Sequence, residues 1–132
     1  MKSSLDKKVP RILVTMGEPA GIGPELLVRI AQSSFAAELV VIADPEILEL
    51  TAIKLKLSLQ LIPIDWEQQS KVHTPGTLFI YPFKLPAEFI VGQLNVENAQ
   101  ATLDMLTKAS RLALDKKVDA LVTAPVHKAN LN

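Results

Sequence analysis

The chain has 132 residues, of which 48% are hydrophobic and 21% charged, so it can form a domain with a buried core and is too apolar to be disordered. Its 14 basic and 14 acidic residues balance without a basic cluster, which argues against nucleic acid or an anionic membrane surface as a partner. Cysteine is absent, which excludes disulfides, thiol catalysis and thiolate metal sites within the chain.

The N-terminal segment, residues 1–10, is polar and is expected to be frayed. It has no apolar stretch of the kind found in secretory signals, and no apolar run in the chain approaches the roughly 18 residues that cross a bilayer. We therefore predict a soluble protein without a membrane segment, with residues 11–132 as its folded part, and the absence of cysteine fits a reducing cytoplasm.

An apolar run over residues 11–16 predicts a buried strand, and a helical pattern of apolar residues begins at Leu26. Between them, residues 17–25 hold three glycines and two prolines, which neither element tolerates, so the chain must turn there. Such a turn directs backbone N–H groups and the positive end of a helix at one point, where an anionic ligand or a nucleotide cofactor could bind. The spacing is equally compatible with a simple strand-to-helix connection.

The turn does not match the common phosphate-binding motifs. A dinucleotide fingerprint has glycines at its first, third and sixth positions; Gly21 and Gly23 fit, but the sixth position holds Leu26. In a P-loop the second glycine is followed by lysine, whereas Gly23 is followed by Pro24. The turn is therefore not one of the usual phosphate binders.

A second apolar run, residues 39–43, predicts a strand that ends at Asp44. An acid near this position binds the ribose in dinucleotide-binding folds. However, Asp44 followed by Pro45 and Glu46 is a strong helix start, with the aspartate as N-cap and the proline at the first helical position. We therefore expect Asp44 to cap a helix, with ribose binding as the alternative.

Strands and helices alternate along the rest of the chain. We predict strands over residues 59–62, 77–81 and 120–123, a loop over 65–76 and a long helix over 95–117. The last of these strands is expected to be buried. The alternation favours an α/β fold in which α/β/α layers surround a largely parallel or mixed sheet.

In the long helix, apolar residues recur at helical spacing, and we interpret them as a core or dimer contact. The predicted stripe consists of Ala99, Leu103, Leu106, Ala109 and Ala113, with Leu112 beside it.

Ligands of open α/β sheets bind beyond the carboxyl ends of the strands. Two loops would occupy that edge: residues 17–23 after the first strand and residues 123–128 after the last. If their strands are near neighbours, the loops converge on one cleft. Lys128 would then be a cation for phosphate or carboxylate, and His127 a hydrogen-bonding or proton-handling group. Two solvated side chains in a surface loop are the alternative.

Three further side chains are not expected to be part of the reaction chemistry. Glu18, the carboxylate within the glycine turn, is expected to cap backbone donors or to order the loop. His73 lies in the polar loop and is expected to be exposed to solvent. Trp66 is expected to pack the start of that loop.

Residues 15–25, with the sequence TMGEPAGIGPE, resemble the N-terminal signature of the 4-hydroxythreonine-4-phosphate dehydrogenase family. Residues 92–95 with the helix that follows, and residues 123–128, resemble later segments of that family in the same order. The resemblance covers nearly the whole chain from residue 11 onward. Residues 21–25 also resemble the first turn of the isocitrate and isopropylmalate dehydrogenases, which implies a fold like theirs.

The resemblance implies a cytoplasmic, homodimeric enzyme of pyridoxal 5′-phosphate biosynthesis. It would oxidise 4-phosphooxy-L-threonine with NAD or NADP, after which the product loses carbon dioxide. A divalent metal (zinc, magnesium or cobalt) would act as a Lewis acid on the substrate hydroxyl, while the nicotinamide carries the hydride. On this basis the cofactor-binding residues are Gly17, Glu18, Gly21, Ile22 and Gly23, and the substrate-cleft residues are His127 and Lys128.

The family's metal-binding histidines lie in later segments of proteins more than twice as long. This chain has two histidines, His73 and His127, whereas a catalytic metal site has about three protein ligands. The resemblance therefore implies that the metal ligands lie beyond this chain and that the chain alone is inactive. Residues 11–132 would be a single α/β domain or the N-terminal part of a larger two-domain subunit.

Two other functions stay open. One is a related metal-dependent decarboxylating dehydrogenase of another hydroxy acid, and the other is a non-catalytic nucleotide-binding module with the same fold. Analogy of fold does not separate them. Part of a larger enzyme would expose apolar surface where the remainder docks, whereas a free-standing module would be a compact monomer with a complete sheet.

Overall fold

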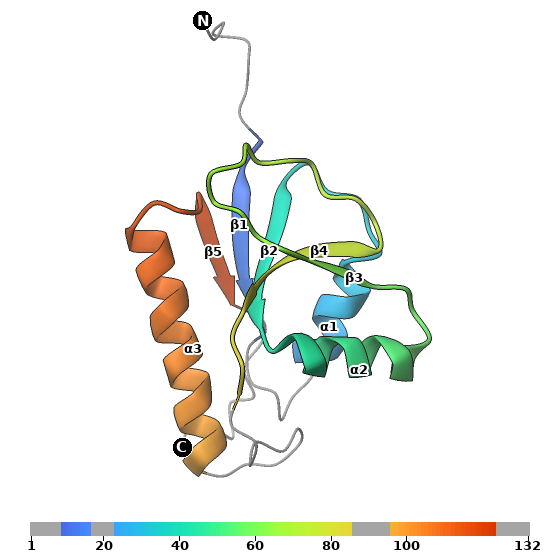
Figure 1. The fold of residues 1–132 in the computed structure, drawn as a ribbon, viewed down its shortest axis with the longest axis vertical. Helices are drawn as coiled ribbons and strands as arrows, with labels where there is room; N and C mark the ends of the chain where they lie inside the picture. The colour runs from blue at the N-terminus through green and yellow to red at the C-terminus, as the bar shows by residue number, and fades with distance from the viewer. Residues whose placement is uncertain (1–8, 17–22, 86–95, 124–132) are drawn as a thin grey trace, which may run out of the picture.

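The computed structural model describes residues 9–16, 23–85 and 96–123, with residues 96–98 described by their backbone alone. In these residues one sheet of five strands is flanked by three helices (Figure 1). In chain order the elements are β1 (Arg11–Thr15), α1 (Gly23–Ile30), β2 (Glu38–Ala43), α2 (Pro45–Leu55), β3 (Gln60–Pro63), β4 (Thr77–Pro82), α3 (Val96–Leu114) and β5 (Ala120–Thr123).

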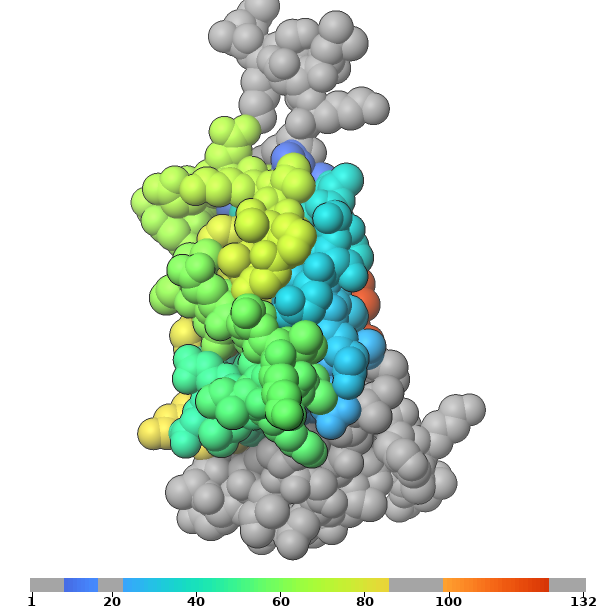
Figure 2. All heavy atoms as spheres, turned by 90° about the vertical axis from the view of Figure 1, so that its right-hand side faces the viewer, coloured from blue at the N-terminus to red at the C-terminus, as the bar shows by residue number. Residues whose placement is uncertain are grey.

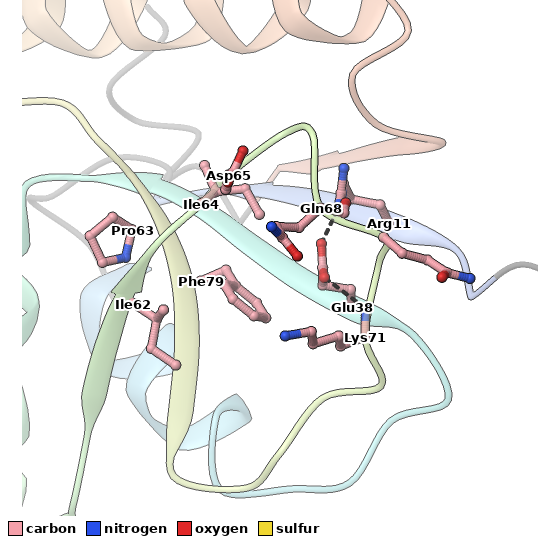
Figure 3. Close-up of a pocket in the computed structure, with 10 residues that line it drawn as sticks. Arg11, Glu38, Ile62, Pro63, Ile64, Asp65, Gln68, Lys71 and Phe79 are labelled. Atoms are coloured by element: carbon pink, nitrogen blue, oxygen red, sulfur yellow. Dashed lines mark hydrogen bonds and ion pairs between the residues drawn. The ribbon is translucent and has the colours of Figure 1, made fainter.

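The sheet is parallel throughout, with the strand order β3-β4-β2-β1-β5. The connections through α1 and α2 cross the sheet in one direction, and the connection through α3 crosses it in the other. Because such crossovers are right-handed, α1 and α2 cover one face and α3 covers the opposite face. Figure 3 shows α3 above the sheet and α1 below it. The predicted α/β fold with α/β/α layers is confirmed.

The sequences of the central strands are continuous apolar runs because of where these strands lie in the sheet. All six side chains of β2 are buried, because a central strand is covered on both faces and cannot alternate between apolar and polar residues. Both helical layers pack on this strand and its neighbours. The helices contribute Leu27, Val28, Leu48, Ala52, Ala101, Met105, Ala109 and Leu112 to one hydrophobic core.

The face of α3 that contacts the sheet differs from the predicted stripe. The buried residues of the helix are Ala101, Met105, Ala109 and Leu112, which recur at helical spacing and therefore share one face. Of the predicted stripe, Ala99 and Leu103 are exposed, so they do not belong to the core, and the alternative of a dimer contact stays a prediction. The reason is that α3 carries apolar residues on two opposite sides, and periodicity does not reveal which side meets the sheet.

The predicted burial of the last strand is also wrong. Ala120 and Thr123 are exposed, and Val122 is 49% exposed. Within the described residues β5 pairs only with β1, at the edge of the sheet, and its outer side is open. An apolar strand sequence is therefore no evidence that the strand is central.

Figure 2 views the molecule from the side of α1 and α2, where these helices and the segment 56–80 form one continuous surface. No helix in the described ranges is long and apolar enough to cross a membrane.

Candidate functional site

The candidate site lies at the carboxyl edge of the sheet, that is, at the end where its parallel strands terminate. β1, β2, β4 and β5 all run toward this edge, and α1 and α2 begin there. Each helix start presents backbone N–H groups without intrahelical partners and the positive end of a helix dipole. The start of α2 is capped by the side chain of Asp44, so the start of α1 is the helix end that an anionic group could meet.

The two loops predicted to form the cleft start from adjacent strands. β1 pairs directly with β5, and Thr15 lies opposite Thr123 in their register. This adjacency is the condition under which the loops were expected to converge. Most of the predicted site residues, namely Gly17, Glu18, Gly21, Ile22, His127 and Lys128, lie outside the described residues, so their side-chain roles stay predictions.

Gly23 is the one predicted cofactor residue that the structure describes. It is the first residue of α1 and is buried together with Pro24, the next residue. Glu25 follows in the first turn, where an acid suits the helix dipole. The predicted strand–turn–helix context is therefore present on both sides of the glycine turn, and the N-terminus of α1 is placed at the candidate site.

Both carboxylate oxygens of Asp44 accept hydrogen bonds from the backbone of the chain. Its Oδ1 accepts a hydrogen bond from the backbone N–H of Glu46 at 3.0 Å, as an N-cap does, and its Oδ2 accepts from the N–H of Leu85 at 3.0 Å. The predicted capping role is confirmed, and each carboxylate oxygen already accepts a backbone hydrogen bond. The bond from Leu85, which comes from a distant part of the chain, has no signal in the sequence.

The same segment, which follows β4, is joined to the end of β2 by hydrogen bonds. The chain leaves β2 toward one face of the sheet and β4 toward the other, and in α/β folds such a reversal often creates the ligand crevice. Here the N–H of Phe83 donates to the carbonyl of Ala43 at 2.9 Å, and Leu85 binds Asp44. These hydrogen bonds therefore join the ends of β2 and β4, whereas the two loops predicted to form the cleft follow β1 and β5.

Thr15 is the last residue of β1 and was not singled out from the sequence. Its side chain is fully buried, and its hydroxyl is the only buried side-chain polar atom of the described residues without a hydrogen-bond partner. Thr15, Ile42 and Tyr81 are aligned across the sheet, and Lys108 of α3 lies 5.6 Å from the centre of the Tyr81 ring. Thr15 therefore faces the α3 side of the sheet, at the end of β1.

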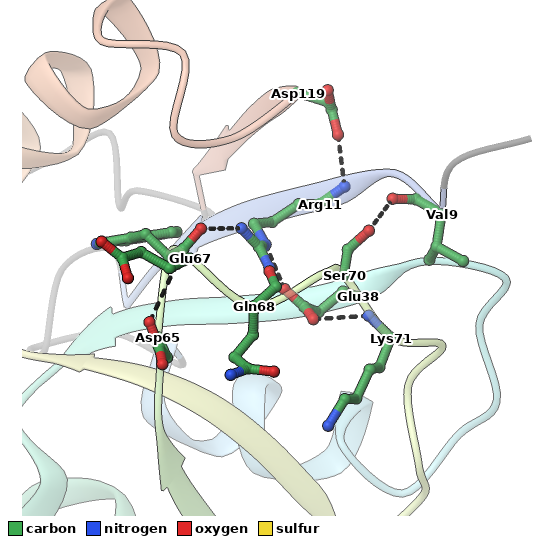
Figure 4. A network of polar contacts seen from close by, with 10 residues as sticks. Val9, Arg11, Glu38, Asp65, Glu67, Gln68, Ser70, Lys71 and Asp119 are labelled. Carbon is green, nitrogen blue, oxygen red and sulfur yellow. Dashed lines mark hydrogen bonds and ion pairs between the residues drawn. The ribbon is translucent and has the colours of Figure 1, made fainter. Parts of the chain in front are cut away.

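The opposite end of the sheet holds a second concave region, a cavity of about 220 Å³ beside Arg11 and Glu38 (Figure 3). Arg11 forms a buried ion pair with Glu38 and donates to the carbonyl of Gln68 at 2.7 Å (Figure 4). The other carboxylate oxygen of Glu38 accepts from the N–H of Lys71 at 2.8 Å. Because these buried charges are satisfied by the protein itself, the cavity is better explained as the rim of a structural network than as a ligand site.

His73 lies in the loop that forms this network, and the prediction for its side chain is wrong. The side chain is buried, not exposed: its Nε2 donates to the carbonyl of Ala31 at 2.8 Å, and its ring meets that of Phe35 edge-on at 5.6 Å. His73 thus attaches the loop to the end of α1, a contact that its polar neighbours in sequence do not reveal. Trp66 packs at the start of the loop as predicted, against Tyr81 and Arg11.

Among the described residues, no three histidine, cysteine, aspartate or glutamate side chains are placed to hold a metal ion. These residues do not fit a divalent metal, and no step through a metal is assigned to them. That the metal ligands lie elsewhere stays a prediction.

A family model described as the pyridoxal phosphate biosynthetic protein PdxA matches residues 35–132. The chain is 46% identical over 122 residues to the 4-hydroxythreonine-4-phosphate dehydrogenase of Shewanella denitrificans, covering 92% of this chain and 37% of that protein. It is 44% identical over 124 residues to the enzyme of the same name from Citrobacter koseri, covering 94% of this chain and 38% of that protein. The chain thus spans little more than a third of the length of these relatives.

Solved structures agree with this similarity. A 4-hydroxythreonine-4-phosphate dehydrogenase from Burkholderia phymatum superposes with a TM-score of 0.74 at 29% identity, over 95% of this chain and 39% of that one. A terephthalate 1,2-cis-dihydrodioldehydrogenase from Burkholderia xenovorans LB400 superposes with a TM-score of 0.66 at 26% identity, over 95% of this chain and 37% of that one.

Proposed function

Because this chain belongs to the PdxA family, we propose that it supplies the parallel sheet and one wall of the active site of an NAD(P)- and divalent-metal-dependent dehydrogenase. The substrate would be 4-phosphooxy-L-threonine, oxidised and decarboxylated in pyridoxal phosphate biosynthesis. The support is identity of 44–46% to enzymes of that name over 92–94% of this chain. We further propose that residues 11–132 are one α/β unit of a larger, homodimeric, cytoplasmic enzyme.

The residues of this chain would bind and position the reactants. The first turn of α1, beginning at Gly23, offers N–H groups to a phosphate of the cofactor or the substrate. Lys128, in the loop after the neighbouring strand β5, would neutralise a phosphate or carboxylate, and His127 would hold or move a proton. When bound, the metal would polarise the substrate hydroxyl and the nicotinamide would accept the hydride.

Asp44 and Leu85 have an indirect role in this proposal. Their hydrogen bond links the ends of β2 and β4, and the ligands would bind on the β1–β5 side, where both predicted loops start.

Binding and turnover of the chain test the proposal separately. Saturation-transfer NMR should show contact between the chain and NAD or NADP, and Lys128→Ala should weaken contact with the phosphorylated substrate about tenfold or more. Exchange of Lys84, an exposed lysine after β4, for alanine is the matched control and should change nothing. Absence of contact with either nucleotide would contradict the cofactor assignment.

The chain used for the binding experiment should not catalyse the reaction. With substrate, nucleotide and zinc, magnesium or cobalt ions added, we expect no substrate-dependent NADH or NADPH production by the chain, since a metal site needs about three protein ligands. Production of reduced nucleotide would show that the chain is an active enzyme by itself and would overturn this part of the proposal.

The similarity to the dihydrodiol dehydrogenase structure favours a second candidate, a related dehydrogenase of another hydroxylated substrate. The two candidates differ in whether the ligand carries a phosphate. In the NMR experiment, contact with 4-phosphooxy-L-threonine but not with an unphosphorylated cis-dihydrodiol would favour the first candidate, and the reverse would favour the second.

A further inference from the structure

The C-terminal end of α1 is attached to the loop between β3 and β4, residues 64–76. The carbonyl of Ala31, the residue after the helix, accepts two hydrogen bonds from this loop. One comes from Nε2 of His73 and the other from the backbone N–H of Gly76, both at 2.8 Å. Ala31 is fully buried, and so is almost all of the His73 side chain. Two donors that are far away in the sequence therefore hold this end of the helix.

The bond from His73 is not required to satisfy the carbonyl of Ala31. A buried carbonyl at a helix end is costly when it has no partner, but the N–H of Gly76 already provides one. Gly76 is attached to the sheet independently of His73, because its own carbonyl accepts from the N–H of Gln60 in β3 at 2.9 Å. The imidazole thus adds a second bond, which further restricts where the end of α1 can lie.

The ring of His73 is itself fixed in place. The backbone N–H of His73 donates to the carbonyl of Ala37, just before β2, at 2.9 Å, and the ring meets that of Phe35 edge-on. Both contacts are made with the segment that connects α1 to β2. A side chain that is locked by packing and by neighbouring hydrogen bonds can hold the group it binds in a defined position.

α1 extends from this fixed end to the candidate site. The helix has eight residues and is therefore about 12 Å long. Its apolar side chains pack on the sheet, and such packing is non-directional. In the described part of the chain, the hydrogen bonds that tie α1 to other elements lie at its C-terminal end. They are those of Ala31 and the bond from Nε2 of Gln32 to the carbonyl of Ser58 at 2.8 Å. A displacement of this end would therefore also move the first turn, at Gly23.

We propose that His73 is a positioning residue for the candidate site. By fixing the C-terminal end of α1, it sets the position of the first turn at Gly23, which would bind a phosphate in the proposed function. The inference rests on the proposed function for the identity of the ligand, but not for the displacement of the helix. His73 contacts neither ligand and takes no part in the reaction chemistry.

The amide signal of Gly23 in the NMR spectrum of the isotope-labelled chain tests the displacement. His73→Phe keeps a ring beside Phe35 and removes the donor, so the signal of Gly23 should shift although it lies about 12 Å away along the helix. His73→Gln keeps an N–H donor on the side chain and should leave the signal where it is in the unmodified chain. An unchanged Gly23 signal in His73→Phe, or failure of this variant to fold, would overturn the proposal.

Titration with NAD tests the consequence for binding. The dissociation constant should rise about tenfold in His73→Phe and stay unchanged in His73→Gln. Ser70→Ala is the matched control, because Ser70 is as buried as His73 in the same loop but donates to the carbonyl of Val9 rather than to α1. This control should change neither the Gly23 signal nor the dissociation constant.

The outcomes separate this proposal from the proposed function. Equal effects of Ser70→Ala and His73→Phe would show that the loop acts through general stability and would overturn the positioning role. If the unmodified chain does not bind NAD, the cofactor assignment fails, and the Gly23 signal alone decides whether His73 positions the helix.

Discussion

The hydroxyl of Thr15 is buried at the end of β1 without a described hydrogen-bond partner. An unsatisfied buried polar group costs about 1–3 kcal/mol, and valine has the same shape without the hydroxyl. We expect Thr15→Val to raise the free energy of unfolding of the chain by about 1 kcal/mol in urea denaturation.

Thr77→Val is the control for this prediction, because the hydroxyl of Thr77 donates to the carbonyl of Thr74 at 2.7 Å. This variant should lose stability. A loss of stability in Thr15→Val as well would mean that its hydroxyl is paired, by a ligand, a water or a part of the chain outside the described residues, and would contradict the prediction.

At the scale of single elements, the helices α2 and α3 end with the same backbone geometry. Lys56 after α2 and Lys116 after α3 have positive φ angles of 57° and 60°. In each case the backbone N–H of that lysine and the next N–H bond carbonyls in the last turn of the helix. This is the geometry of a Schellman motif, in which glycine is preferred because a side chain strains the left-handed conformation.

We expect Lys56→Gly and Lys116→Gly each to stabilise the chain by roughly 0.5–1 kcal/mol, because glycine relieves this strain. Thermal unfolding followed by circular dichroism measures the effect. Lys54→Gly, within the last turn of α2, is the contrast and should destabilise by about 1 kcal/mol, since glycine weakens a helix interior. Equal destabilisation by all three substitutions would show that the left-handed lysines carry no strain.

In the molecule as a whole, the edge of the sheet where the strands begin and the edge where they end have different roles. The edge where the strands begin is held by the buried Arg11–Glu38 pair, and the N–H of Arg11 also donates to Asp119 beside β5 at 2.7 Å. Ser70 of the loop after β3 adds a hydrogen bond to the carbonyl of Val9. The edge where the strands end carries the loops of the proposed site. Stability and ligand binding should therefore respond to different substitutions.

Glu38→Ala should lower the free energy of unfolding by roughly 3–5 kcal/mol, because it leaves the Arg11 charge buried without its partner. Arg11→Met/Glu38→Leu should cost less, since no unpaired charge remains. Urea denaturation gives the stabilities, and NMR contact with NAD should be unchanged in the double variant. Loss of nucleotide contact in a folded double variant would show that the two edges are not independent.

Features that depend on neighbouring residues could be predicted from the sequence. The alternation of strands and helices, the cap at Asp44, the turn before Gly23 and the α/β class were all predicted, because periodicity, capping residues and glycine act over a few positions. The motif order also indicated the family. The site was predicted as two loops, and the pairing of β1 with β5 makes those loops start side by side.

Which surfaces meet could not be predicted from the sequence. The buried side of α3, the open edge at β5, the burial of His73 and the bond between Leu85 and Asp44 all depend on residues far apart in the chain. Periodicity identifies the apolar sides of an element but not what covers each of them, because that is set by the order of strands in the sheet and the hand of their connections.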